Sequence, residues 1–422
     1  MISRTRWLLR QLSRELWFRA TIFAVLGCGA AMAGVIAERY MTWDPPTRIS
    51  AETVERILDI LASSMLAVTT FSLNVMVTAY GSATSNVTPR ATKLLRQDSI
   101  TQNALGAFIG AFLFGLVGII SLGTELYGDR GRLVLFVVTL AVIAFVITAM
   151  LRWIDHLSGL GRVGETARIV EETVREALRD RAVAPTLGAR PYDPAQTADG
   201  DHAPIATPRI GYVQHVDLEG LSALAEGAGC TIYIEKPSGA FVFANQPVAR
   251  VLTDSGAPQD AETTARIEQA FVIDDQRSFD QDPRFGLAVL AEIASRALSP
   301  AINDAGTAID VVGRATRLLL EYANAPRQDD EILYPRLRLA PLVASDLLSD
   351  AFGPIARDAA AIVEVQIRLQ KALGALARSG NGEMRAAALR EARFALDHAE
   401  RALALDSDKQ KLRDLNATIA AI

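Results

Sequence analysis

Cysteine and histidine are scarce in this chain of 422 residues, which has only two cysteines and four histidines. Cys28 and Cys230 lie far apart in the sequence, so neither a disulfide framework nor a cysteine metal site is plausible. The chain has no phosphate-binding loop and no Ser/His/Asp arrangement, and its histidines are dispersed, at His156, His202, His215 and His398. Enzymatic chemistry is therefore the least favoured class of function, and we expect no catalytic residues, no cofactor and no metal.

The chain also lacks a strong charge of either sign. Its net charge is −5, which gives no indication of nucleic-acid binding, so we expect no nucleic-acid partner. Half of the residues are hydrophobic, yet 22% are charged, which is too many for a protein that lies wholly within a membrane. Apolar spans must therefore coexist with a soluble part, and the apolar runs end near Trp153.

The most informative apolar run extends from Ile57 to Tyr80. As a helix it reaches about 36 Å, enough to cross a hydrocarbon core of roughly 30 Å. It nevertheless contains small or polar residues that recur at helical spacing and form one stripe, namely Ser63, Ala67, Thr70, Asn74 and Thr78. Two interpretations remain open: close helix packing with the hydroxyls bonded to their own backbone, or a wetted pathway.

Three further runs are long enough to span a membrane, at Ala20–Ala37, Ala104–Leu122 and Leu133–Leu151. A cleaved signal peptide is the competing interpretation of the first run, because Ala31-Met32-Ala33 resembles a cleavage site. We discount it because the run is longer than a usual signal core. Small residues recur every fourth position in the third run, which predicts a helix that packs closely against a neighbour.

Arginine and lysine predict the orientation of these spans. They are concentrated in the amino-terminal segment, in the loop around Arg90 to Arg96 and after the fourth span. Residues 1–19 interleave arginine with tryptophan and leucine, a pattern typical of a basic amphipathic helix that lies on an anionic lipid surface. We therefore expect a multi-pass protein of the inner (cytoplasmic) membrane, in contact with membrane lipid and with both termini in the cytoplasm.

The predicted fold class is a membrane α-helical domain with four transmembrane helices, joined to a cytoplasmic α+β region in which a small β unit precedes helices. The β unit is predicted from short β-prone runs between turns. The linker is predicted from repeated proline and glycine. The expected divisions are a transmembrane domain at 1–160, a cytoplasmic helix at 161–183, a linker at 184–208, the β-rich domain at 209–256 and a helical domain at 257–422.

Two polar segments of the helical domain mark helix starts. Asp282 and Pro283 suit an N-cap and a first helical position, and after Pro300 either Asn303 or Asp304 can cap the next helix. The oxygen-rich side chains of Asp280, Asp282, Asn303 and Asp304 also suit a hard cation, so capping and a cation site are both open, with capping favoured. The remaining helices are predicted at Pro354–Ala377, Glu383–Asp406 and Lys409–Ile422.

The same segments carry a family resemblance. Thr88-Pro89-Arg90 after the polar span, Asp280-Gln281-Asp282-Pro283, and Ser299-Pro300-Ala301-Ile302-Asn303-Asp304 resemble the predicted bacterial membrane proteins of domain of unknown function 2254. The resemblance covers nearly the whole chain. It departs from the family pattern at Ala305, where proline is common. It implies a membrane location and no established activity, and it makes candidate motif residues of Pro89, Arg90, Asp280, Asp282, Ser299, Pro300, Asn303 and Asp304.

Two functions remain in view. The first is an oligomeric channel for an ion or a small solute, in which Ser63, Thr70, Asn74 and Thr78 line an axis between copies of the chain. Four spans can hardly enclose a pathway alone, so this function requires a homo-oligomer. The absence of charges inside the spans argues against a proton-coupled pump. The alternative is a membrane-anchored interaction or sensor protein without transport.

Overall fold

The computed structural model describes residues 4–40, 49–124, 126–157, 159–193, 202–256, 259–326, 332–379 and 381–422. The chain divides into two compact units. One comprises Leu9–Ser85 and Pro89–Thr166, and we call it the long-helix unit. The other comprises Met1–Leu8, Asn86–Thr88 and Ala167–Ile422, and we call it the α+β unit. Pro194 and Gly200, two of the proline and glycine residues of the predicted linker, lie outside the described residues.

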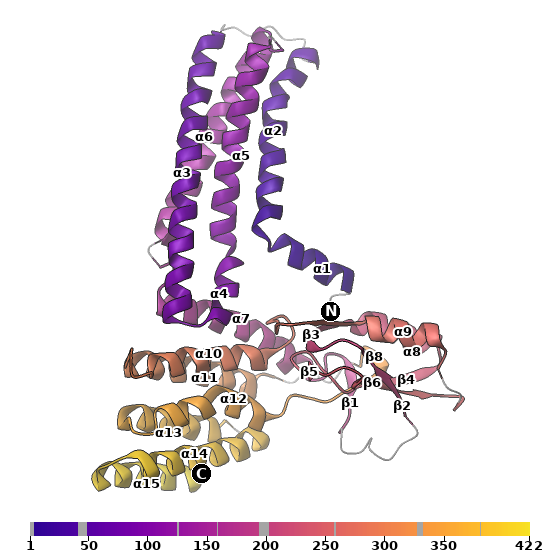
Figure 1. Ribbon diagram of the computed structural model, residues 1–422, viewed down its shortest axis with the longest axis vertical. Coiled ribbons are helices and arrows are strands. Elements are labelled where there is room, and N and C mark those ends of the chain that lie inside the picture. Colours follow the sequence, from indigo (N-terminus) through magenta and orange to yellow (C-terminus); the bar gives the residue numbers. More distant parts are fainter. Residues whose placement is uncertain are drawn as a thin grey trace. The chain divides into compact units, whose positions relative to one another are not determined.

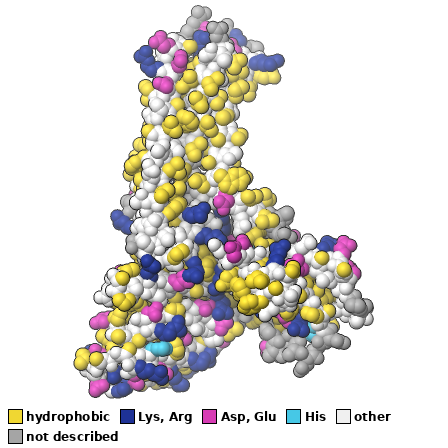
Figure 2. Space-filling view, in the orientation of Figure 1, with side chains coloured by type: hydrophobic (Ala, Val, Ile, Leu, Met, Phe, Trp, Pro, Cys, Tyr) yellow, Lys and Arg dark blue, Asp and Glu magenta, His cyan; other side chains and the backbone are white. Residues whose placement is uncertain are grey.

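Four helices of the long-helix unit are long and apolar enough to cross a membrane, as the sequence predicts. They are α2 (Leu16–Tyr40), α3 (Ala51–Asn86), α5 (Ser99–Gly123) and α6 (Asp129–Leu157), with the short α4 (Pro89–Arg96) between α3 and α5 (Figure 1). Each helix extends beyond its apolar run because polar residues continue the backbone hydrogen bonding at the ends. Charged side chains gather near the ends of this unit and hydrophobic ones between them (Figure 2).

The third span is a packing helix, as its small residues predict, and its neighbour on the Gly106 and Gly110 side is α2 of the same chain. A Cβ at Gly27 of α2 would collide with the carbonyl oxygen of Gly110, and one at Gly110 would collide with the backbone of Phe23. Gly115 and Gly118 of α5 instead face Leu58 of α3. Glycine therefore brings α5 close to two neighbouring helices.

The α+β unit contains two sheets. The strands of the five-stranded sheet lie in the order β1 (Ala189–Pro191), β8 (Tyr334–Leu339), β4 (Cys230–Ile234), β6 (Pro247–Thr253) and β2 (Ala203–Ala206). The three-stranded sheet has the order β5 (Phe241–Val242), β3 (Gly211–Val216) and β7 (Phe271–Asp274). Helices α8 (Leu218–Gly227) and α9 (Ala261–Gln269) complete this region, and buried apolar residues from both sheets and both helices form one core.

The β region is larger than the predicted range of 209–256. Strands β1 and β2 come from the predicted linker, and β7 and β8 come from the predicted helical domain. Strand β8 lies between β1 and β4 and is parallel to both, with Leu337 paired to Ile232. Its six residues are too few to show a clear period, and its partners are distant in sequence, so local patterning could not place it.

The remaining helices of this unit begin with α7 (Val163–Val183) and continue with α10 (Pro283–Ala297) and α11 (Ala305–Asn324). The last four helices are α12 (Ala344–Asp358), α13 (Val363–Ala377), α14 (Gly382–Ala402) and α15 (Asp406–Ala420). The predicted start at Pro354 is wrong, because that proline lies inside α12. The buried Leu347, Leu348 and Phe352 extend the apolar face of α12 in front of it, and this burial outweighs the preference of proline for a first helical position.

Candidate functional site

The polar stripe of α3 faces away from the other helices of its own chain. Ser63, Ala67, Thr70, Asn74 and Thr78 are all exposed. The opposite face of the helix is buried and carries Leu58, Leu61, Ala62, Met65, Thr69, Ser72 and Met76. The structure therefore brings the four pore-lining candidates onto one surface, and the bundle of a single chain does not cover that surface.

The hydroxyls of the stripe are bonded to their own backbone, as one of the two interpretations expects. Ser63 Oγ donates to the carbonyl of Asp59 at 2.8 Å, Thr70 Oγ1 to that of Leu66 at 3.0 Å and Thr78 Oγ1 to that of Asn74 at 2.9 Å. The side-chain amide of Asn74 differs, because it has no hydrogen-bond partner among the described residues. An amide left unpaired in hydrocarbon costs several kcal/mol. An Asn74 amide that faced hydrocarbon would therefore need water or another polar group as its partner.

A second polar position of α3 has a structural role that the sequence analysis did not assign. Ser72 is buried, and its hydroxyl accepts a hydrogen bond from Trp153 Nε1 at 3.0 Å. Trp153 itself is only 2% exposed, so the tryptophan at which the apolar runs end is buried within the long-helix unit. A tryptophan buries a large apolar surface if its single N–H finds an acceptor, and Ser72 supplies one.

The long-helix unit also contains a partly buried contact between Asp98 and His156, next to the start of α5. Asp98 caps α5 by accepting hydrogen bonds from the backbone N–H groups of Ile100 and Thr101. Its carboxylate lies 2.8 Å from His156 Nε2. Burial alone would raise the pKa of Asp98, but hydrogen bonds from His156 and Thr101 lower it to about 2. Sequence reasoning missed this pair because its members are distant along the chain.

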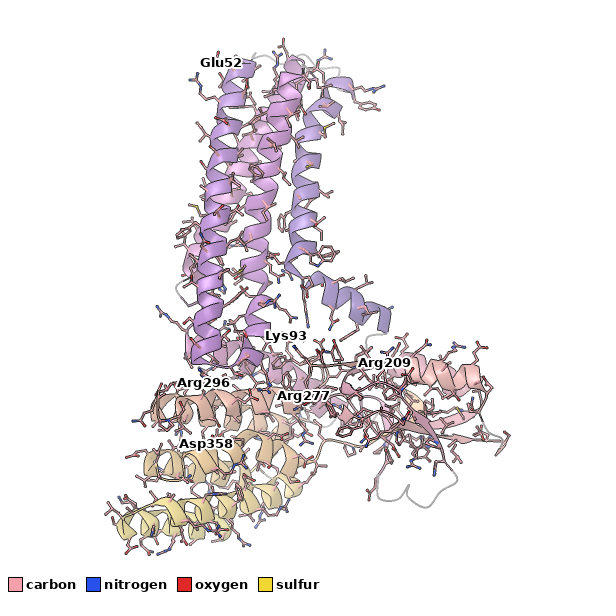
Figure 3. The ribbon with its side chains drawn as sticks, viewed as in Figure 1. Glu52, Lys93, Arg209, Arg277, Arg296 and Asp358 are labelled. Carbon is pink, nitrogen blue, oxygen red and sulfur yellow. The ribbon has the colours of Figure 1, made fainter. Side chains whose placement is uncertain are left out.

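Asp282 is the N-cap of α10, as predicted, and is also part of a buried ion pair. It accepts a hydrogen bond from the Phe285 N–H at 3.0 Å and lies 2.7 Å from Arg277 Nη2, while its side chain is only 3% exposed. Figure 3 shows Arg277 near the start of α10. Gly239 has a positive φ of 93° and packs so tightly that a Cβ there would collide with the Asp282 carboxylate. Asp282 therefore connects α10 to the turn before β5.

Asp280 accepts a hydrogen bond from Trp7 Nε1 at 3.0 Å, and the Trp7 ring stacks on His215 of β3 at 5.1 Å between centroids. Trp7 belongs to α1 (Arg4–Ser13) and is 2% exposed. Its predicted place on the lipid surface is therefore wrong, although the exposed Leu8, Leu9 and Leu12 leave an apolar face on the same helix. Stacking and a satisfied N–H together stabilise the indole inside the α+β unit.

The motif at residues 299–304 forms the turn between α10 and α11. Ser299 Oγ donates to the Arg296 carbonyl at 2.7 Å, Pro300 follows the end of α10, and Asn303 adopts a positive φ of 52°. Asp304 caps α11 by accepting from the Thr307 N–H at 3.0 Å. The predicted capping role is confirmed for both Asp282 and Asp304. Within the described ranges, no three His, Cys, Asp or Glu residues are grouped so that they could hold a metal ion.

The Thr88-Pro89-Arg90 segment divides between the two units. Thr88 belongs to the α+β unit and donates from its hydroxyl to Glu292 of α10 at 2.8 Å. Pro89 occupies the first position of α4, where its missing N–H costs nothing, and Arg90 is exposed beside it.

Four helices are long and apolar enough to cross a membrane, and the same chain carries a large α+β unit; these are the features of a multi-span membrane protein. A family model described as "Predicted membrane protein (DUF2254)" matches residues 13–375. The chain belongs to this family, which confirms the resemblance carried by its motifs.

The names of the curated relatives that align with the chain state no activity. An uncharacterised protein of Mycobacterium bovis and one of Mycobacterium tuberculosis are each 25% identical to this chain over 352 residues. Each alignment covers 78% of this chain and 64% of the relative, so the chain spans less than two thirds of the length of these curated relatives. No solved structure shows a significant match to the chain.

Proposed function

We propose that the protein forms a homo-oligomeric channel for an ion or a small solute, in which the polar stripes of neighbouring α3 helices line a shared axis. The α+β unit assembles or gates the oligomer. We propose further that the protein lies in the inner membrane of a bacterium with both termini in the cytoplasm, and that it has no enzymatic activity.

The observation that carries this proposal is the exposure of the stripe together with the unpaired amide of Asn74. Hydroxyls that bond to their own backbone tolerate lipid, but an amide needs a polar partner. The four-helix bundle offers none among the described residues. A water-lined axis between copies satisfies Asn74 and also uses the remaining lone pairs of Thr70 and Thr78.

The alternative function, a membrane-anchored interaction or sensor protein, draws support from the size of the α+β unit. This unit includes Ala167–Ile422, which is more than half of the chain. In this alternative the stripes pack against each other without enclosing water, so no solute passes.

The two functions predict different effects of Asn74→Leu on solute flux. In proteoliposomes we expect the wild type to release entrapped K⁺ or Cl⁻, and we expect Asn74→Leu to reduce that flux at least tenfold because it dries the path. The same variant should keep the oligomer, measured by chemical crosslinking in the membrane, because no hydrogen bond within the chain is lost.

Ser64→Leu is the matched control. Ser64 is equally exposed on α3 but lies roughly 80° around the helix from the centre of the stripe. Flux through this variant should equal that of the wild type. Wild-type flux through Asn74→Leu, or dissociation of the oligomer by the same substitution, would contradict the channel, and a monomeric wild type in native membranes would remove its premise.

A further inference from the structure

The α+β unit contains a cavity of about 390 Å³ that no motif identified. It lies where the loop after α7 and the end of α11 meet the starts of α12 and α14. Its polar lining includes the side chains of Arg181, Tyr322, Asn381 and Glu383, and Pro341, Leu342 and Met384 are among the apolar residues around it.

Arg181 is the unusual member of this lining. Its side chain is almost fully buried, since the residue is 4% exposed. Nη1 donates to the Pro185 carbonyl at 3.2 Å, but the buried Nε has no hydrogen-bond partner among the described residues. Among the described residues, no carboxylate lies within ion-pair distance of this guanidinium, whereas Arg175, Arg277, Arg284 and Arg314 each have one.

The guanidinium keeps its charge at neutral pH. Burial lowers the pKa of Arg181 to about 10, against the opposing influence of Tyr322 and Asp282. A buried charge is normally compensated by an opposite charge, because its desolvation is costly. The compensation that the described residues do not supply can come from a bound anion, and a guanidinium presents paired N–H donors that suit carboxylate and phosphate oxygens.

The other walls limit what such an anion can be. Glu383 is engaged with the backbone, since its Oε1 accepts from the Ala344 N–H at 2.7 Å. Asn381 caps α14, so the positive end of that helix dipole also lies at the cavity. Leu342 and Met384 provide apolar surface beside these polar groups. The combination suits a charged head next to a small apolar body.

We propose that this cavity binds a small organic anion, a carboxylate or a phosphate monoester with a short apolar body, and that Arg181 is its charge partner. The site is separate from the proposed pore and does not depend on it.

The test uses the full-length chain in detergent, with phenyl phosphate and benzoate as probes. Each probe is titrated against chloride at equal ionic strength, and the melting temperature is followed by tryptophan fluorescence. At least one probe should raise the melting temperature saturably by several degrees, because a ligand that binds only the folded state stabilises it. The probe that responds identifies the charged head as phosphate or carboxylate.

Arg181→Met keeps the buried aliphatic stem but removes the charge, so the response should be lost. Arg296→Met is the matched control, because Arg296 is exposed on α10 and should leave the response intact (Figure 3). If Arg181→Met does not fold, Leu342→Trp keeps Arg181 and places a larger side chain in the cavity lining, so it should also abolish the response.

Three outcomes would overturn the proposal. The first is a wild type that responds to neither probe, and the second is an undiminished response in either cavity variant. The third concerns Asp329, Asp330 and Glu331, which lie outside the described residues. A response that appears only when these three are replaced by Asn, Asn and Gln would mean that the chain supplies its own counterion.

Discussion

At the residue scale, buried charges determine how the α+β unit holds together and how it responds to pH. Glu171 of α7 is 4% exposed and lies 2.7 Å from Arg314 Nη1, 2.9 Å from Arg175 Nη2 and 3.1 Å from Arg317 Nη2. Two of these arginines come from α11, so one carboxylate joins two helices. Burial alone would raise the pKa of Glu171, but the hydrogen bonds from Arg314 and Arg317 lower it.

We expect Glu171→Gln to destabilise the protein by about 2 kcal/mol, because it removes the charge-assisted hydrogen bonds that the buried carboxylate accepts from Arg314 and Arg317. A lowered folded-state pKa stabilises the fold above the unfolded value, about 4.5, and this contribution is lost as the pH falls further. The variant lacks this carboxyl, so acidification should lower its melting temperature less than that of the wild type. Glu172→Gln is the control, since Glu172 is exposed, and an equal effect there would refute the assignment.

Glu391 of α14 behaves in the opposite way. Its Oε1 is buried and has no hydrogen-bond partner in the described part of the chain, and burial raises the pKa of the carboxyl despite the nearby Arg357. A raised folded-state pKa means that the charged form destabilises the fold at neutral pH, and that stability increases as the pH falls through the folded-state pKa. Glu391→Gln should stabilise the protein at pH 8 by on the order of 1 kcal/mol. Melts from pH 8 to pH 5 test this, and equal pH dependence in variant and wild type would contradict it.

At the element scale, the two predicted caps have different surroundings and should differ in their effect on stability. Asp304 is exposed and serves α11 alone, whereas Asp282 is buried, pairs with Arg277 and packs on Gly239. The sequence does not distinguish Asp282 from Asp304, because both residues simply precede a helix.

Asp304→Ala should cost about 1 kcal/mol, the usual value for an N-cap. Asp282→Ala should cost on the order of 3 to 5 kcal/mol, because it also leaves Arg277 without its partner. Chemical denaturation of the full chain measures both. Equal losses would show that the Arg277 ion pair adds nothing. If added Mg²⁺ or Ca²⁺ stabilised the wild type but neither variant, the cation site would be supported instead of capping.

At the scale of the whole molecule, the orientation of the spans decides which surfaces meet the cytoplasm. Positions 46 and 195 are natural probes of the two sides by sequence, but both lie outside the described residues. Ser50, before α3, and Arg209, before β3, are exposed substitutes.

We expect a cysteine at position 50 to react with a membrane-impermeant maleimide in spheroplasts, and one at position 209 to react only after lysis. The chain for this experiment carries Cys28→Ala, while Cys230 is buried and needs no change. Labelling of position 209 in intact spheroplasts would contradict the cytoplasmic location of the termini.

The sequence by itself determined the features that depend on local chemistry. An apolar run of sufficient length predicts a span from the thickness of a bilayer alone, and all four runs are helices in the structure. Asp before Pro283 and Asp304 after the break at Pro300 predict helix starts because the N-cap bond closes within three residues.

Only the tertiary structure decided which residues meet across long stretches of chain. It placed β8 between β1 and β4, buried Trp7 against His215, and turned Ser72 inward while leaving Asn74 exposed on the same helix. It also left Arg181 beside a cavity with no carboxylate partner among the described residues. Such outcomes depend on the packing of distant segments, and the period of a single helix or strand shows that one face is distinct without showing what covers it.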